Sequence, residues 1–342
     1  MNASFLTVTF WILASALLLF AAYRWWFKYL FSRKNPEQEE KTLIEDALKH
    51  LFDNEYKSLI STDLSLSSSL KISNDQTHSL LSRMETMNLA TKNSEEQLLL
   101  TKEGRAYALK VIRIHRIWER YLADETGYHE DHWHNNADQV EHKMTLSQAN
   151  KIAYRLGDPV FDPHGDPIPG VDGTLPAFEG VPLSEVAPGE IARIIHVEDE
   201  PLPVYQQLLA MGLFPGLEIK VLQIDHHKIS YIADGEEKIL IPAFAGHITV
   251  KPQPHTAFNE QKSLTLTDVP LGSKAIVTGI SAVCRRQHKR RLMDLGVVPG
   301  TEIEVMLESA GKNPRAYRML NTIIALRNQQ ASMVLVEPLK AS

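Results

Sequence analysis

The chain opens on an apolar segment. Residues 1–23 carry no charged side chain, and residues 5–22 are almost continuously apolar. At about 1.5 Å per residue, roughly 20 residues cross the ~30 Å hydrocarbon core of a bilayer. Aromatic and basic residues follow the apolar run, and no basic residue precedes it, which is unlike a cleaved signal peptide. The pattern predicts a single-pass transmembrane helix over 1–23 and a juxtamembrane linker over 24–40. By the positive-inside rule, the domains that follow lie on the cytoplasmic side of the plasma (inner) membrane.

Residues 41–104 show helical periodicity and then a hairpin pattern. Residues 41–56 alternate apolar and polar positions as an amphipathic helix does, and two shorter helical segments follow at 61–73 and 74–90. Residues 91–104 fit two short strands before a longer helix begins. This order predicts a winged helix-turn-helix domain, in which the second helix of the motif normally enters the major groove of DNA.

The helix that would contact DNA is chemically weak for that task. The six positions from Asn74 to Ser79 include no Lys or Arg. Residues 41–110 carry nine Lys and Arg against ten Asp and Glu, a difference of −1, so attraction to phosphates would be weak. Polar side chains can still read base edges. DNA binding and a purely structural winged helix therefore both stay open. The candidate DNA-contacting residues are Asn74, Gln76, Thr77, His78, Ser79 and Arg83.

Residues 105–170 are helical and rich in metal-ligand side chains. His134, Asp138, Glu141 and His142 share one helical face, since positions three and four apart stack on a helix. His115 and Glu119 form a second such pair upstream. The single cysteine, Cys284, excludes a disulfide and a thiolate cage, so the ligands would be nitrogen and oxygen, which suits Mn²⁺, Fe²⁺ or Zn²⁺. The alternative interpretation is two solvated polar helix faces.

The carboxyl-terminal half contains an internal repeat. The segment LSEVAPGEIARI (183–194) matches LTDVPLGSKAIV (266–277), and LLAMGLFPGLEIKV matches RLMDLGVVPGTEIEV some 83 residues later. Each copy predicts short strands, one helix and a tight Pro-Gly turn, which fits a small SH3-like barrel. The barrels are predicted over 181–254 and 262–342, after a Pro- and Gly-rich connection that ends in a linker at 171–180.

Composition adds few constraints. The 342 residues carry a net charge of −6, which gives no overall attraction to nucleic acid. The basic cluster RRQHKRR (285–291) is either a solvated helix face or a contact for anionic lipid, a transporter or DNA. No nucleophile motif or phosphate-binding loop is evident, so the chain is predicted not to be an enzyme.

Three strings together carry a resemblance to a known family. LTKEGRAYALKVIRIHRIWERYL, HNNADQVEHKM and LGDPVFDPHGDPIPG, in this order and spacing, resemble the diphtheria toxin repressor (DtxR) family over residues 41–170. That family consists of metal-activated dimeric repressors of iron or manganese genes. The resemblance implies a homodimer formed by the helices around residues 105–155, bound to operator DNA.

The same resemblance implies two metal sites. The main site would use Asp46 with Asp138, Glu141 and His142, and the ancillary site would use His115, Glu119 and His134. His164 is expected to be structural. The sequence departs from the family at Lys49, where manganese-type members have a second carboxylate. It also departs at Asp75 and Ser79, where iron-type members have Pro and Gln.

The repeated barrels resemble a second family. The pattern LxxGLxPGxxIxV is similar to the FeoA domain, a small barrel found with ferrous-iron transport. Some DtxR-type repressors carry one such domain, which in some members donates a ligand to the ancillary site. Glu198, Glu200 and Gln206 lie in the comparable stretch, but none of them is expected to be a ligand.

The predicted fold class is therefore multidomain α+β, with a transmembrane helix, a winged helix-turn-helix domain, a helical dimerisation and metal-binding domain (105–170) and two SH3-like β-barrels. The predicted function is that of a membrane-tethered transcriptional regulator of metal homeostasis, in which Fe²⁺ or Mn²⁺ locks a DNA-binding dimer. The alternative is an accessory protein of a ferrous-iron or manganese membrane transporter that does not bind DNA.

Overall fold

The computed structural model describes Phe20, Tyr23, Arg24 and residues 36–254, 258, 263–281, 284 and 286–339, without the side chains of 286 and 287. The predicted membrane segment and most of its linker lie outside these residues. Within the described part of the chain, no helix combines the length and the apolar character needed to cross a bilayer. The chain divides into two compact units, residues 1–109 and 110–342.

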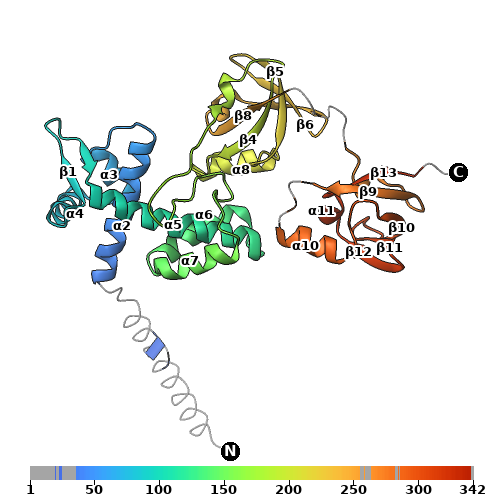
Figure 1. The fold of residues 1–342 in the computed structure, drawn as a ribbon, viewed down its shortest axis with the longest axis horizontal. Helices are drawn as coiled ribbons and strands as arrows, with labels where there is room; N and C mark the ends of the chain where they lie inside the picture. The colour runs from blue at the N-terminus through green and yellow to red at the C-terminus, as the bar shows by residue number, and fades with distance from the viewer. Residues whose placement is uncertain are drawn as a thin grey trace, which may run out of the picture. The chain divides into compact units, whose positions relative to one another are not determined.

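Among its described residues, the first unit contains α2 (Pro36–Tyr56), α3 (Asp63–Leu70), α4 (Asn74–Thr86), a two-stranded hairpin of β1 (Ala90–Lys92) and β2 (Leu98–Leu100), and the start of α5 (Lys102–Glu125), in the order that the sequence predicts (Figure 1). Thr62 and Ser73 cap α3 and α4 with reciprocal side-chain and backbone hydrogen bonds, which fixes where each helix begins. Leu48, Leu66 and Met84 are fully buried between the helices.

Helix α4 presents fewer side chains to solvent than predicted. Thr77 is 1% exposed, and its hydroxyl donates to the Ser73 carbonyl at 3.0 Å, so its assignment as a DNA contact is wrong. The reason is that Thr77 lies on the same face as the buried residues Leu80, Leu81 and Met84. The other candidates, Asn74, Gln76, His78, Ser79 and Arg83, are exposed.

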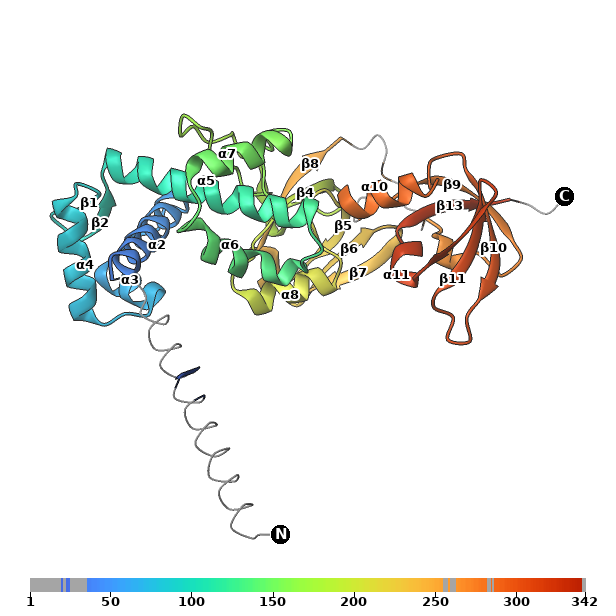
Figure 2. The ribbon, with the colours of Figure 1, turned by 90° about the horizontal axis from the view of Figure 1, so that it is seen from below.

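The helices of the second unit form a small layer of their own. The C-terminal part of α5 is followed by the short 3₁₀ segment η1 (Glu130–His132), α6 (Trp133–Glu141) and α7 (Leu146–Arg155). Helices α6 and α7 lie alongside α5 (Figure 2). Ile114 and Ile117 of α5 share a core with Ala149 and Ile152 of α7.

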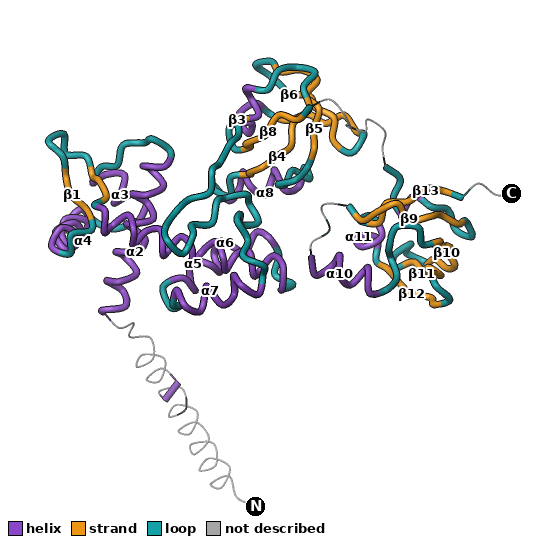
Figure 3. The backbone as a smooth tube through the Cα atoms, viewed as in Figure 1, coloured by secondary structure: helices purple, strands orange, loops and turns teal. Residues whose placement is uncertain are grey.

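Two antiparallel sheets make up the rest of this unit (Figure 3). The first has the order β3-β8-β4-β5-β6-β7, from β3 (Val181–Pro182), β4 (Ile191–Val197), β5 (Glu218–Ile224), β6 (Ile229–Ala233), β7 (Glu236–Leu240) and β8 (Ile248–Gln253). The second has the order β12-β11-β10-β9-β13, from β9 (Lys274–Ile280), β10 (Glu302–Glu308), β11 (Arg315–Met319), β12 (Thr322–Leu326) and β13 (Val334–Pro338).

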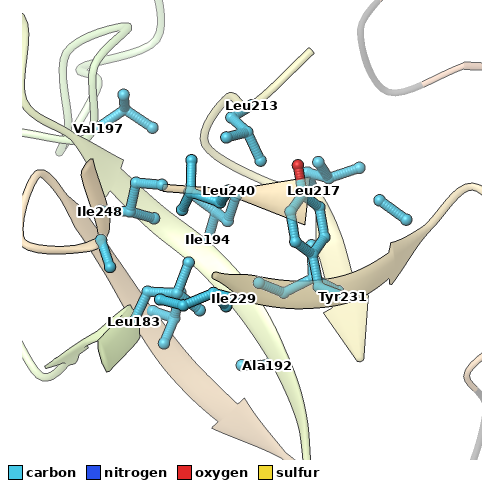
Figure 4. Packing of buried hydrophobic residues seen from close by; sticks show 14 of the residues in the cluster. Leu183, Ala192, Ile194, Val197, Leu213, Leu217, Ile229, Tyr231, Leu240 and Ile248 are labelled. Atoms are coloured by element: carbon cyan, nitrogen blue, oxygen red, sulfur yellow. The ribbon is translucent and has the colours of Figure 1, made fainter. Parts of the chain in front are cut away.

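The two sheets are built alike. Helices α8 (Leu202–Ala210) and α10 (Arg286–Asp294) follow the equivalent strands β4 and β9, and the shorter helices α9 (Pro242–Ala245) and α11 (Asn328–Ala331) precede the last strand of each sheet. A register shift interrupts the β5–β6 pair after Val221 and the β10–β11 pair after Val305, at matching places. Figure 4 shows the core of the first sheet, in which Ile194, Leu240 and Ile248 are fully buried. The sequence repeat is therefore a structural repeat.

Candidate metal centre

Helix α5 supplies the first two donors of the centre. His115 and Glu119 are one turn apart and are 5% and 1% exposed. The His115 Nε2 atom lies 3.1 Å from a Glu119 carboxylate oxygen. A polar pair this deeply buried is costly unless each member has a partner, so the neighbouring groups decide its role.

Helix α6 brings His134 and Asp138 to the same place. Its start is fixed by Trp133, which is buried among Leu122 and Ala123 of α5. The His134 Nδ1 atom lies 3.4 Å from Glu119, and its Nε2 atom lies 3.6 Å from Asp138. His115, Glu119 and His134 thus converge, as the one-turn spacings predict.

The end of α6 adds Glu141 and His142. A Glu141 carboxylate oxygen lies 2.5 Å from His115 Nδ1, and an Asp138 oxygen lies 3.4 Å from the same nitrogen. His142 Nε2 lies 3.6 Å from the second Glu141 oxygen. His115 therefore faces Glu119 with one ring nitrogen and Glu141 with the other. His115, predicted for the ancillary site alone, therefore also contacts two residues predicted for the main site.

The first β-domain contributes donors that the sequence interpretation missed. Asp199, in the turn between β4 and α8, lies 2.8 Å from His134 Nδ1. The carboxylate of Glu200 lies 3.5 Å from His134 Nε2. Glu200 is one of the three residues considered from the family pattern. The acidic run Glu198–Glu200 before a proline was the available signal for both donors.

His164, which the sequence suggests to be structural, lies beside the same donors. It is 2% exposed, and its Nδ1 atom lies 3.8 Å from Glu119 and 3.7 Å from Asp199. Neither ring nitrogen has a hydrogen-bond partner within the part of the chain that the structure describes. Glu119, His164 and Asp199 form a further group of three convergent donors.

The loop before the first sheet fixes the position of His164. One carboxylate oxygen of the buried Asp162 accepts the backbone N–H groups of His164, Gly165 and Asp166, each at 2.9 Å. Gly165 has a φ of +100°, and a Cβ there would lie 2.0 Å from the Ile195 carbonyl oxygen of β4. Only glycine permits this close approach, and it places His164 against the first β-domain.

The distances between donors fit a shared cation. Three groups of donors lie within this unit: His115, Glu119 and His134; His115, Asp138 and Glu141; and Glu119, His164 and Asp199. Within each group, the ligand atoms all lie within 4.8 Å of one another. With metal–ligand bonds of about 2.1 Å, adjacent ligands of one ion are roughly 3.0–3.4 Å apart. The 3.4–3.8 Å separations around Glu119 and His164 are at or slightly above this spacing and are too long for a good hydrogen bond. The buried ring nitrogens of His164 still need a polar partner, which a cation could supply.

The electrostatics of the cluster also favour a bound cation. Burial would raise the pKa of Glu119, but the imidazoles of His115 and His164 hold that pKa well below its usual range. Burial opposes protonation of His134, but hydrogen bonding to Asp199, Glu119 and Glu200 raises the pKa of His134. Carboxylates that stabilise a buried proton in this way also attract a metal cation, which needs the same nitrogens in their neutral form.

Asp46, the remaining predicted ligand, lies on α2 in the first unit and is half-buried. Glu141 and His142 belong to the second unit.

Matches to known families agree with this centre. Residues 101–170 match the family model of the iron dependent repressor, metal binding and dimerisation domain. Residues 181–252 and 264–338 each match the FeoA domain. All the donors on α5 and α6 fall in the first match, whereas Asp199 and Glu200 fall in the first FeoA domain.

Individual relatives extend the likeness. The chain is 26% identical over 213 residues to the iron-dependent repressor IdeR of Mycobacterium leprae. The matched region covers 58% of this chain and 92% of that protein. A solved manganese-dependent transcriptional repressor in complex with manganese superposes with a TM-score of 0.57 at 26% identity, over 61% of this chain and 99% of the other. A probable metal transport system membrane protein of Chlamydia trachomatis is 38% identical over 76 residues, 22% of this chain and 17% of that protein. The chain is thus a metal-dependent regulator homologous to the iron- and manganese-dependent DtxR/IdeR-type repressors, with two FeoA domains.

Proposed function

We propose that the protein is a sensor of divalent transition-metal ions, Fe²⁺ or Mn²⁺, with Zn²⁺ as a chemically competent substitute. The observation that carries the proposal is the convergence of the buried His115, Glu119 and His164 with the partly buried His134 and Asp199. Imidazole and carboxylate donors without thiolates suit these ions. The relatives' printed descriptions name iron and manganese.

The metal would act by joining the two units. We assign Asp46 of α2, with Asp138, Glu141 and His142 of α6, to the main site, and His115, Glu119 and His134 to the ancillary site. An ion bound by ligands from both units would favour one orientation of the first unit against the second. A ligand shifts such an equilibrium by its difference in affinity for the two states. The half-buried position of Asp46 on α2 supports this assignment.

The response would be read by a homodimer on operator DNA. The match of residues 101–170 to a dimerisation domain supports the dimer. The exposed side chains of Asn74 and Ser79 on α4 are available to base edges. Three other candidates have partners: Gln76 accepts from the Ser73 N–H, His78 lies 3.7 Å from Asp63, and Arg83 pairs with Glu40 at 3.0 Å.

The membrane anchor is part of the same proposal. The uncharged apolar run 5–22, with basic residues only after it, supports a single-pass helix with the regulator on the cytoplasmic face of the plasma membrane. Helix α2 begins at Pro36, so the predicted linker 24–40 shortens to residues 24–35, which would hold the first unit within about 40 Å of the bilayer.

A second function has its own support. The 38% identity of a 76-residue segment to a metal transport membrane protein favours an accessory role at a ferrous-iron or manganese transporter without DNA binding. The lack of Lys and Arg at the start of α4 points the same way.

Two measurements test the proposal. Titration calorimetry of the full chain with Mn²⁺ should show binding from which Glu119→Ala removes the ancillary-site component, with the exposed Glu95→Ala as a matched control. A mobility-shift assay with the protein's own promoter DNA then separates the two functions. Metal-dependent, salt-sensitive retardation supports the repressor, and metal binding without retardation at low salt supports the transporter accessory. Absence of metal binding by the unaltered chain would reject both.

A further inference from the structure

The second FeoA domain carries a surface that the first lacks. Residues 181–252 contain 5 Lys and Arg against 10 Asp and Glu, a net charge of −5, whereas residues 264–338 contain 10 against 6, a net charge of +4. The reversal is concentrated at one helix. Helix α8 of the first domain, LPVYQQLLA, has no charged residue and follows the metal-facing Asp199 and Glu200. Its counterpart α10, RQHKRRLMD, is strongly basic.

The charged side of α10 is open to solvent. Lys289, Arg290 and Arg291 are exposed, while Leu292 is 4% exposed and anchors the helix to the core of the domain. Apolar side chains accompany the cations: Met293 is 47% exposed and Leu295 is 39% exposed. The surface therefore mixes positive charge with exposed hydrophobic area.

The neighbouring β11–β12 turn extends this surface. Leu320 is 69% exposed, and its Cδ1 atom lies 2.8 Å from where a Cβ on Gly296, just after α10, would stand. Leu320 has a φ of +44° and Asn321 a φ of +65°. A leucine is costly in this left-handed region and gains nothing by facing water. An exposed, strained apolar residue at a hairpin tip indicates a function outside the fold itself.

The first domain shows what an ordinary turn looks like here. Its β6–β7 turn is Asp234–Gly235, the type of pair that left-handed hairpin turns favour. The register places Ile323 where the first domain has Glu237, and both positions are exposed. The second domain has thus replaced acidic residues by apolar ones beside a basic helix.

We propose that α10 and the Leu320 turn form a docking surface for the anionic headgroup region of a lipid bilayer. The cations match the negative charge of acidic lipids, and the short row of Met293, Leu295 and Leu320 can enter the boundary between headgroups and acyl chains. Nucleic-acid phosphates would use the cations but leave these apolar side chains in water. The surface lies apart from the metal donors in sequence and fold, so the inference goes beyond the proposed sensing function.

A fluorescence experiment on the full chain tests the inference. Leu320→Cys is labelled with an environment-sensitive nitrobenzoxadiazole probe, and the protein is mixed with nanodiscs of pure phosphatidylcholine or of phosphatidylcholine with phosphatidylglycerol. We expect about a twofold or greater increase in emission, with a blue shift, only with the anionic nanodiscs, and a loss of the increase at high salt. Asp234→Cys, at the matching turn of the first domain, is the control and should stay unchanged. The unsubstituted chain gives the background from the buried Cys284.

Charge reversal decides the outcome. The triple variant Lys289→Glu, Arg290→Glu and Arg291→Glu in the Leu320→Cys background should abolish the response without changing Mn²⁺ affinity. An equal response with neutral nanodiscs, an equal response at position 234, or a response to duplex DNA in place of lipid would overturn the proposal. Because the readout needs no metal, its failure would leave the sensing function standing, and a failure of metal binding would leave this result unaffected.

Discussion

The two FeoA domains show how one fold serves two purposes. They share strand pairing, the position of the bulge and a core in which Leu208 and Leu292, or Tyr231 and Tyr317, occupy matching places. They differ in the turn before the central helix. In the first domain this turn presents Asp199 to His134, and in the second the basic helix α10 begins there. The comparison teaches that the buried positions preserve the architecture while the exposed turns were free to acquire different chemistry.

The shared cores can be tested by equal truncation. Leu208→Ala and Leu292→Ala should each lower the unfolding free energy of its own domain by about 2–5 kcal/mol, because each removes a buried side chain and leaves a cavity. Domain-resolved hydrogen exchange of the full chain would measure both. The half-exposed Leu202→Ala is the control, with an effect within about 0.5 kcal/mol. Markedly unequal losses would break the equivalence of the two cores.

The metal-facing turn should matter in one domain alone. Asp199→Ala with Glu200→Ala removes two carboxylates next to His134 and should weaken Mn²⁺ binding by about 10- to 100-fold in titration calorimetry. The exposed pair Glu236→Ala and Glu237→Ala in the same domain is matched in charge and should change affinity less than about twofold, since distant exposed charges are screened by salt. Similar losses for both pairs would mean that the turn acts only through net charge.

The pH dependence of folding stability should change sign when metal binds. In the metal-free protein the pKa of His134 is raised above its unfolded value by Asp199, Glu119 and Glu200, although burial opposes this. The stability that protonated His134 contributes is fully present below the unfolded pKa of about 6.5. It is lost as pH rises from there toward the folded pKa, by on the order of 1 kcal/mol for each pH unit. Metal needs neutral imidazoles, so stability with excess Mn²⁺ should instead increase from pH 6 to pH 8.

Thermal unfolding at pH 6, 7 and 8, with chelator or with Mn²⁺, would show these opposite slopes. Asp199→Asn should flatten the metal-free slope, and the exposed Asp234→Asn should leave it intact. Parallel slopes with and without metal would contradict the shared use of His134 by proton and cation.

The smallest effect is expected at a buried hydroxyl in the first core. Tyr231 is fully buried, burial raises its pKa to about 12, and its hydroxyl has no hydrogen-bond partner in the described part of the chain. Tyr231→Phe should therefore be neutral or stabilise the first domain by up to about 1 kcal/mol in thermal unfolding. A loss above about 1 kcal/mol would reveal a polar partner for this hydroxyl.

Much of the helical site follows from sequence, because local spacing determines which side chains share a helix face. His115 with Glu119, and His134 with Asp138, are predicted by one-turn spacing alone. Asp199 and His164 are not, since each is brought in by the folding of the loop and first sheet onto the helices, with a long sequence separation from Glu119. Thr77 shows the converse problem, because a polar residue on a helix can still face the core.

The two ring nitrogens of His115 have a consequence for the order in which the centre fills. A neutral imidazole carries a single proton, which resides on one nitrogen or the other. Glu119 faces one of these atoms and Glu141 faces the opposite one. An ion that bound the ring from either side would therefore fix the tautomer that the other side meets. Under the proposed function, occupancy of the two halves would be coupled through this one five-membered ring.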